Sequence, residues 1–238
     1  MKMFRSVLAG VLLMSTAYVQ AQTADDVVNK HIAAIGGREV IGKIKSQITE
    51  SNLNVMGSDL SSTSTLLVGK GFKNVANFNG QEIVQVITTA GGWMVNPLAG
   101  QTDPTPLPED QVKSSQIALE VGGGLVNYKE RGAKIELAGT EKVENVNAIK
   151  LKMTDKEGKE SFYFIDPATN YVIKHEATLN ANGQDVTMVS TFSNYKKTDI
   201  GYVIPFTTVR NQGFEMTITI NKVEFNKEVD PKIFDMPK

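Results

Sequence analysis

The chain has 238 residues, with 25 Lys and Arg residues, 26 Asp and Glu residues, two histidines and no cysteine. This balance lacks the concentrated basic face that nucleic-acid binding requires, so it argues against a nucleic-acid partner. Without cysteine the fold cannot depend on disulfides, and no lipid can be attached through a cysteine side chain.

The first 21 residues have the three parts of a secretory signal peptide. Lys2 and Arg5 form the positive start, an apolar and uncharged stretch follows, and a Val-Gln-Ala sequence offers cleavage after Ala21. The apolar stretch is too short for a membrane anchor, which needs about 20 apolar residues. We therefore expect export across a membrane, removal of residues 1–21, and a single mature domain of residues 22–238 without a lipid anchor.

Two helices are expected at the start of the mature chain. Apolar residues recur at three-to-four spacing across residues 24–35, and Asp25 and Asp26 occupy the first turn, where the helix dipole favours acids. A Gly-Gly pair ends this helix, and residues 38–43 predict a short second one.

From residue 46 the pattern changes to β-branched and aromatic segments separated by turns, which is typical of strands. Asn79-Gly80 is a strong hairpin signal between two of them. The expected strands in this half are residues 46–56, 60–70, 72–78, 81–89 and 93–95.

A proline-rich segment interrupts the strands. Residues 96–108 contain four prolines and predict a long loop, because helix and strand interiors do not tolerate that density. Residues 108–121 predict a helix that three consecutive glycines end. We expect residues 96–124 to act as a mobile lid hinged at these glycines; a helix that plugs the sheet statically has the same pattern.

After residue 133 the strands return at short, regular intervals, so their neighbours must be antiparallel. The fold class expected is mainly β with a few helices. About eleven or twelve strands would curl into a strongly curved half-barrel covered by helices. The turn signals include Asn182-Gly183. The expected strands are residues 134–141, 148–154, 160–166, 171–179, 185–195, 202–211 and 214–225.

Some strands are apolar on both faces and must be covered twice. In residues 160–166, Phe162 and Phe164 point one way and Tyr163 and Ile165 the other. The covering helix or a bound apolar ligand could provide the second cover, and an ordinary filled core explains the pattern equally well.

The sequence lacks the motifs of common catalytic sites. His31 lies on the first helix and His175 in a strand, and Leu179 stands where a His-Glu-x-x-His zinc motif needs its second histidine. There is no nucleophile elbow and no phosphate-binding loop. The sequence therefore predicts no metal, no cofactor and no catalytic residue.

Several short segments form a recognisable set: residues 24–32, the Gly36-Gly37 pair, residues 91–97, the segment into Pro108-Glu109-Asp110, residues 202–206 and residues 233–237. Together they resemble the outer-membrane lipoprotein-sorting (LolA-like) carrier superfamily, over nearly the whole mature chain. The resemblance implies a curved half-barrel whose apolar concavity, closed by helices, accepts acyl chains. Well-studied carriers use a strand arginine to latch the lid; Arg210 is the one candidate on an expected strand, and its role stays open.

The function expected is that of a monomeric periplasmic carrier for lipid or lipid-modified protein, with only transient membrane contact. The main alternative is a non-catalytic envelope module that uses the same fold to sense a protein partner, and a third is a hydrolase whose site is assembled only by folding. Residues expected to line the apolar cavity are Trp93, Met94, Phe162, Phe164, Met188, Phe192 and Phe206, and those expected on the lid are Val112, Ile117 and Leu119.

Overall fold

The computed structural model describes residues 22–181 and 184–237. The expected signal peptide and the expected turn at Asn182-Gly183 lie outside the described residues. None of the described helices is both long and apolar enough to cross a bilayer.

Two short helices open the described chain. Helix α1, Ala24–Ala34, starts with a capping box in which Thr23 and Asp26 each accept the other's backbone N–H. Gly36 ends it with φ +118°, and a Cβ there would lie 2.8 Å from a backbone oxygen of the neighbouring turn, so only glycine fits. Helix α2, Gly37–Gly42, follows directly.

A single antiparallel sheet of 13 strands forms the rest of the framework. Strands follow chain order from β6 to β1 and from β13 to β7, and the pairing of β1 with β13 joins the two halves. The strands are β1 Ser46–Val55, β2 Ser58–Leu67, β3 Gly71–Phe78, β4 Gln81–Thr88, β5 Gly92–Asn96, β6 Gln101–Pro106, β7 Lys134–Val143, β8 Val146–Thr154, β9 Glu160–Ile165, β10 Val172–Ala181, β11 Gln184–Lys197, β12 Val203–Asn211 and β13 Glu215–Phe225.

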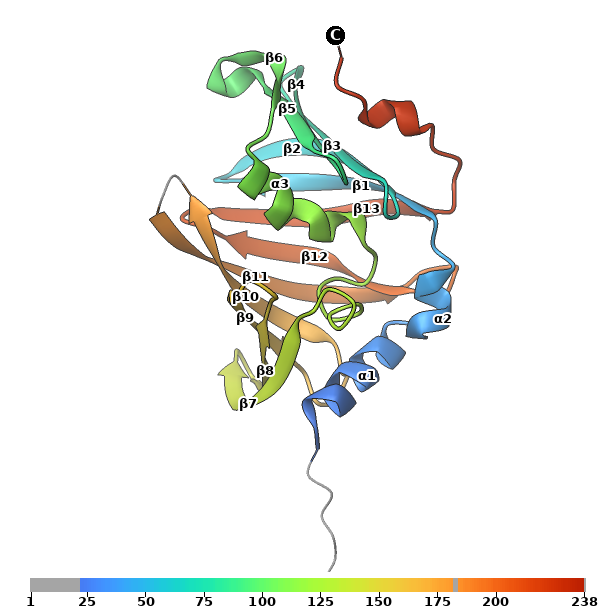
Figure 1. Ribbon diagram of the computed structural model, residues 1–238, viewed down its shortest axis with the longest axis vertical. Helices are drawn as coiled ribbons and strands as arrows, with labels where there is room; N and C mark the ends of the chain where they lie inside the picture. Colours follow the sequence, from blue (N-terminus) through green and yellow to red (C-terminus); the bar gives the residue numbers. More distant parts are fainter. Residues whose placement is uncertain (1–21, 182–183, 238) are drawn as a thin grey trace, which may run out of the picture.

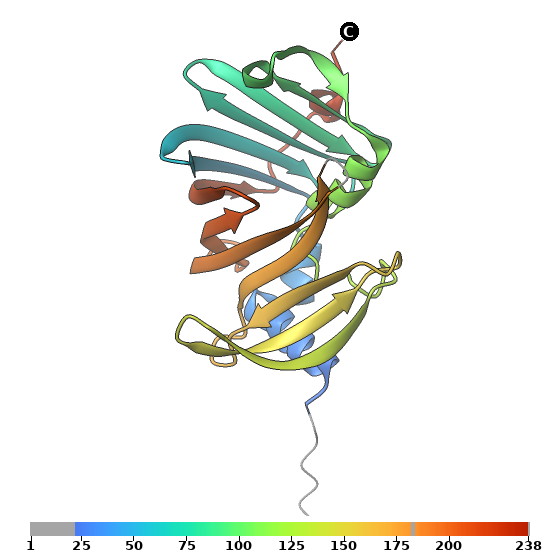
Figure 2. The same ribbon diagram turned by 90° about the vertical axis from the view of Figure 1, so that its left-hand side faces the viewer.

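The sheet is strongly curved and does not close. Its edge strands, β6 and β7, lie at opposite ends of the molecule in Figure 2. Leu66 on β2 and Leu151 on β8, six strands apart along the chain, belong to one core cluster with Ile41 of α2 and Val121 of the long connection after α3. Such distant strands can pack against the same covering segments only if the sheet curves around them. The helices therefore lie on its concave face. The expected mainly β, helix-covered half-barrel is confirmed.

The proline-rich segment is where the expectation was wrong. Instead of one long loop, the 3-10 helix η1, Pro97–Ala99, is followed by β6, which pairs with β5 and contains Pro104 and Pro106. Strand β6 is the outermost strand, so one of its two edges pairs with no other strand. Prolines are tolerated in an edge strand because a missing N–H on that open edge costs no hydrogen bond between strands. This extra strand raises the count to 13.

The expected helix after the prolines is present in two parts. Helix α3, Glu109–Ser115, continues into the 3-10 helix η2, Gln116–Leu119. Figure 1 shows this segment in front of the strands around β2 and β13. The Leu119 carbonyl accepts a 2.9 Å hydrogen bond from Gly69, and Gln116 Nε2 donates to the Thr88 carbonyl at 3.0 Å.

Candidate ligand-binding face

The concave face holds an open apolar pocket of about 300 Å³ between η2 and the strands. Strands from both halves of the sheet form its floor and the segment after η2 forms its roof. Apolar groups make up more than half of its walls, beside polar side chains such as Gln47, Ser64 and Glu120, so it can accept an apolar group. The lining residues are Gln47, Ser64, Leu66, Phe72, Ala118, Glu120, Val121, Gly122, Tyr202, Ile204, Pro205, Thr208 and Ile220.

A second pocket of about 270 Å³ adjoins the first. It lies between α2 and residues 120–127, and Glu120 and Val121 line both pockets. The segment at Glu120 and Val121 therefore separates the two, and a displacement of that segment would join them into one apolar groove.

Arginines hold the connection of residues 120–133, which covers the concave face together with the helices. Arg131 Nη1 lies 2.7 Å from the Glu120 carboxylate, and its Nη2 donates to the Gly124 carbonyl. Arg38 of α2 donates to the Val126 carbonyl at 2.9 Å. These charge-assisted bonds are stronger than neutral ones. They hold the roof of the pockets from inside the cover, and no arginine of a described strand bonds to it.

Helix α1 is tied to the same connection. Asp25 accepts a hydrogen bond from the Tyr128 hydroxyl and lies 2.6 Å from Lys129 Nζ. The bond from Lys129, followed by that from Tyr128, holds the pKa of the Asp25 carboxyl below its usual value. Dipole complementarity in the first helical turn is thus only part of the role of Asp25, because this acid also fastens the cover.

The three consecutive glycines are packed rather than open. Gly124 lies against Tyr163 on β9 so closely that a Cβ would collide with the phenol oxygen. Gly122 has φ +88° and a Cβ there would collide with Val126. Close approach to the sheet accounts for Gly124 and packing within the cover accounts for Gly122, whereas Gly123 has open space around it.

Four of the seven expected cavity residues lie on the concave face. Met94 packs beside Ile87 under α3 and η2, and Phe192 and Phe206 pack against the large core cluster. Met188 is two residues before Ser190 and four before Phe192 on β11, so alternation puts it on the same face. Their contact with a ligand stays a prediction.

The other three, Trp93, Phe162 and Phe164, lie on the convex face, contrary to expectation. Trp93 is buried in a cluster with Val86 and Phe234. Phe162 and Phe164 alternate with Tyr163, which faces the helices, so both point to the opposite face. Their rings lie beneath lysine side chains there. Lys150 Nζ is 4.7 Å from the centroid of the Phe162 ring, and Lys174 Nζ is 4.4 Å from the centroid of the Phe164 ring. Lysine stems therefore provide the second cover of this strand.

The expected lid residues divide in a similar way. Val112 and Leu119 are buried together against Ile87 and Leu107. Ile117 is 39% exposed and points away from that contact. The segment therefore rests on the sheet through a small apolar contact.

Two polar residues that the sequence analysis considered for other roles lie on the concave face, a position that their strands alone did not predict. Arg210 and His175 are largely buried there, and Arg210 Nε and His175 Nε2 have no hydrogen-bond partner. Burial, followed by the nearby Arg210 charge, lowers the pKa of His175 to about 4. Within the described ranges no three His, Asp or Glu side chains are grouped to hold a metal ion.

No family model matches the chain, and no curated protein matches it. Several solved structures, in contrast, match the chain. A putative outer membrane lipoprotein-sorting protein domain from Vibrio parahaemolyticus matches with a TM-score of 0.56 at 15% identity, covering 88% of this chain and 95% of that one. A LolA superfamily protein from Nitrosomonas europaea matches with a TM-score of 0.58 at 12% identity, covering 90% and 98%. The chain has the LolA-like fold.

A DUF1329 family protein from Desulfovibrio piger also matches, with a TM-score of 0.55 at 15% identity, covering 89% of this chain and 97% of that one. At such low identity the likeness concerns the fold. The resemblance read from the sequence is confirmed at that level, and the ligand has to be argued from the residues of the concave face.

Proposed function

We propose that this protein is a non-catalytic periplasmic carrier that binds the acyl chain of a lipid or lipid-modified polypeptide on its concave face. The observation that supports it is the apolar pocket of about 300 Å³ between η2 and the strands. Each CH₂ group removed from water contributes about 0.8 kcal/mol, so an acyl chain binds without any specific polar contact.

The size of the pocket supports a carrier whose cover moves. Its volume lies at the lower end of the range of about 300–1,000 Å³ for small-molecule sites. One chain fits there, and more acyl groups require the roof at Glu120 and Val121 to move and join the second pocket. A carrier has to release its cargo, and a roof that moves provides the route.

The direct test is native mass spectrometry of the protein purified from the periplasm, with extraction of bound lipid. We expect a bound species with the mass of an acyl lipid or lipopeptide. Ala118→Trp should abolish it, because Ala118 lines the pocket and the larger ring would fill it. The matched control, Ser114→Trp, places the same ring at an exposed position of α3 and should leave the bound species unchanged.

The proposal would be wrong if the wild-type protein carried no lipid and bound no added fatty acid. A co-purified peptide without an acyl group would instead favour a module that senses a protein partner.

A further inference from the structure

A row of polar side chains crosses the concave face next to the apolar pocket. His175 on β10 lies opposite Ser190 on β11, and Ser190 lies opposite Arg210 on β12. The ring of His175 lies 4.3 Å from that of Tyr163, a residue of the concave core cluster. The row therefore runs along the inner face of β9 to β12.

The direction of the Arg210 side chain follows from its strand. Thr208, two residues earlier, lines the pocket. Residues 207–211 keep a regular register with both neighbouring strands, without a bulge. Because side chains alternate along a strand, Arg210 points to the same face as Thr208, roughly 7 Å further along β12.

Arg210 is a half-buried cation that has no ion-pair partner among the described residues. Its Nε atom is inaccessible and has no hydrogen-bond partner. Among the described residues, none of the ion pairs includes Arg210. Burial lowers the pKa of its guanidinium. Charged groups are rarely buried without a partner, because the lost hydration is costly.

The groups around Arg210 donate hydrogen bonds or are neutral. Ser190 contributes a hydroxyl that is 2% exposed, and neutral His175 has a free Nε2. The acid next to His175, Glu176, alternates onto the convex face, where its carboxylate lies 2.6 Å from Lys174 Nζ. The site thus has a positive charge and nearby polar hydrogens, and none of the acids whose side chains the structure describes lies in it.

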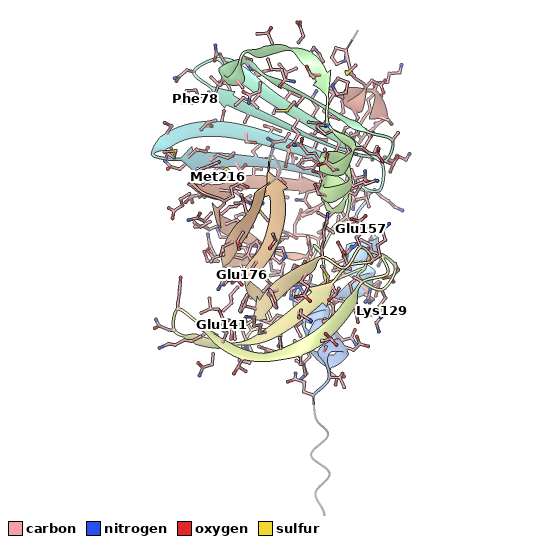
Figure 3. The ribbon with its side chains drawn as sticks, turned by 60° about the vertical axis from the view of Figure 1, so that its left-hand side comes forward. Phe78, Lys129, Glu141, Glu157, Glu176 and Met216 are labelled. Atoms are coloured by element: carbon pink, nitrogen blue, oxygen red, sulfur yellow. The ribbon has the colours of Figure 1, made fainter. Side chains whose placement is uncertain are left out.

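The position of the row fits the head of an amphiphile. Arg210 lies opposite Met216 of β13. Figure 3 shows Met216 on the edge formed by strand ends, on the same side as Phe78 and away from Lys129 beside α1. Along β12, the concave face is lined by the pocket residues first and by Arg210 nearer to this edge.

We propose that Arg210, with Ser190 and His175 beside it, binds the anionic head group of an amphiphile, a carboxylate or phosphate, whose acyl chain occupies the pocket at Thr208. This inference rests on the proposed carrier function and adds the charge of the cargo. A guanidinium pairs with both anions through two parallel hydrogen bonds, which fixes the orientation of the head as well as its charge.

The test compares two ligands of equal chain length, decanoate and 1-decanol, by isothermal titration calorimetry at pH 8. Wild-type protein should bind decanoate at least about tenfold more tightly than decanol, which corresponds to about 1.4 kcal/mol. Arg210→Met should remove this preference while still binding decanol. Arg210→Lys should keep part of it, and Lys222→Met, which removes a charge 55% exposed on the other face, should keep all of it.

The outcomes separate the inference from the proposed function. Binding of both ligands with equal affinity, or a preference that survives Arg210→Met, would overturn the Arg210 site and leave the carrier intact. Failure of both ligands to bind any variant would overturn the carrier and this inference together. Titration with decyl phosphate compares the affinity for a phosphate head group with that for the carboxylate of decanoate. Displacement of decanoate by millimolar inorganic phosphate would show that the site binds free anions and not the head group of an amphiphile.

Discussion

Trp93 Nε1 donates a 3.0 Å hydrogen bond to the backbone carbonyl of Phe234, 141 residues further along the chain. The Phe234 ring lies over Gly71, where a Cβ would come within 2.5 Å of it. The C-terminal 3-10 helix η3, Pro231–Phe234, is thereby fixed to the convex face of β3 and β5. This contact stabilises the fold on the side away from the candidate ligand site.

Phe234→Ala should lower the free energy of unfolding by about 3–5 kcal/mol, because it leaves a cavity beside Trp93. The measurement is urea denaturation followed by circular dichroism. Met236→Ala, at a side chain that is 46% exposed, should change stability by less than about 0.5 kcal/mol. Acyl binding by folded Phe234→Ala protein should match the wild type; a selective loss of binding would contradict the structural role given to this contact.

Gly124→Ala should destabilise the protein by about 1–3 kcal/mol, since the new methyl group collides with the Tyr163 phenol. Tyr163→Phe removes the oxygen that is closest to the new Cβ. The double variant should therefore recover part of the loss, which a double-mutant cycle measures as a coupling energy between the two positions. Additive effects of the two substitutions would show that Gly124 is required for chain flexibility and not for space.

The hairpins and the helix starts could be predicted because their signals are local. Asn79 and Gly80 have φ +51° and +83°, the pair of positive values that a two-residue hairpin turn requires. The capping box at Thr23 is equally local. Such features depend on a few neighbouring residues, and the sequence contains all of them.

The face of each strand could not be predicted in the same way. Alternation separates Phe162 from Tyr163, but it does not say which of the two faces the helices. Trp93 was expected in the cavity because it is an aromatic residue on a strand. The C-terminal segment that covers it on the convex face returns from the far end of the chain, so no local pattern reveals that contact. The edge position of β6, which makes its prolines acceptable, is also a property of the whole sheet.

His175 should make stability depend on pH. Its pKa is about 4 in the folded protein against 6.5 for the free side chain, and burial is the main cause. Because this pKa is lowered, the stabilisation is complete above pH 6.5 and is lost as the pH falls toward 4. At 1.36 kcal/mol per pKa unit, the loss is about 3 kcal/mol.

Urea denaturation between pH 4.5 and 7.5 measures this effect, with His175→Gln as the comparison. The variant should lose less stability on acidification. Tyr163, Arg210 and Glu176, which surround position 175, are present in both proteins, so the difference between the two curves reports His175 itself. His31, whose pKa burial also lowers, titrates in both and cancels in the difference. Stability curves that run parallel over the whole range would show that His175 is protonated as readily in the folded protein as in the unfolded one.

The segment formed by α3 and η2 should move when an acyl ligand enters. Two hydrogen bonds, from Gly69 to Leu119 and from Gln116 to Thr88, and a small apolar contact hold it on the sheet. The 13-stranded sheet beneath is continuous and has no comparable break. Entry into the pocket at Ala118 is therefore easier by lifting this segment than by separating strands.

Cross-linking tests this movement. Cysteines at positions 116 and 88, bridged by a short reducible bis-maleimide, would tie η2 to β4, and the chain has no other cysteine to interfere. Binding of a fluorescent fatty acid should slow by at least about tenfold, which corresponds to about 1.4 kcal/mol of barrier, and recover on reduction. A control bridge between positions 142 and 147, which pair on β7 and β8, should leave the rate unchanged because it restrains strands that already stay together. Unchanged kinetics in the bridged 116–88 protein would mean that α3 and η2 form a static plug, and that the ligand enters by the edge of strand ends near Met216.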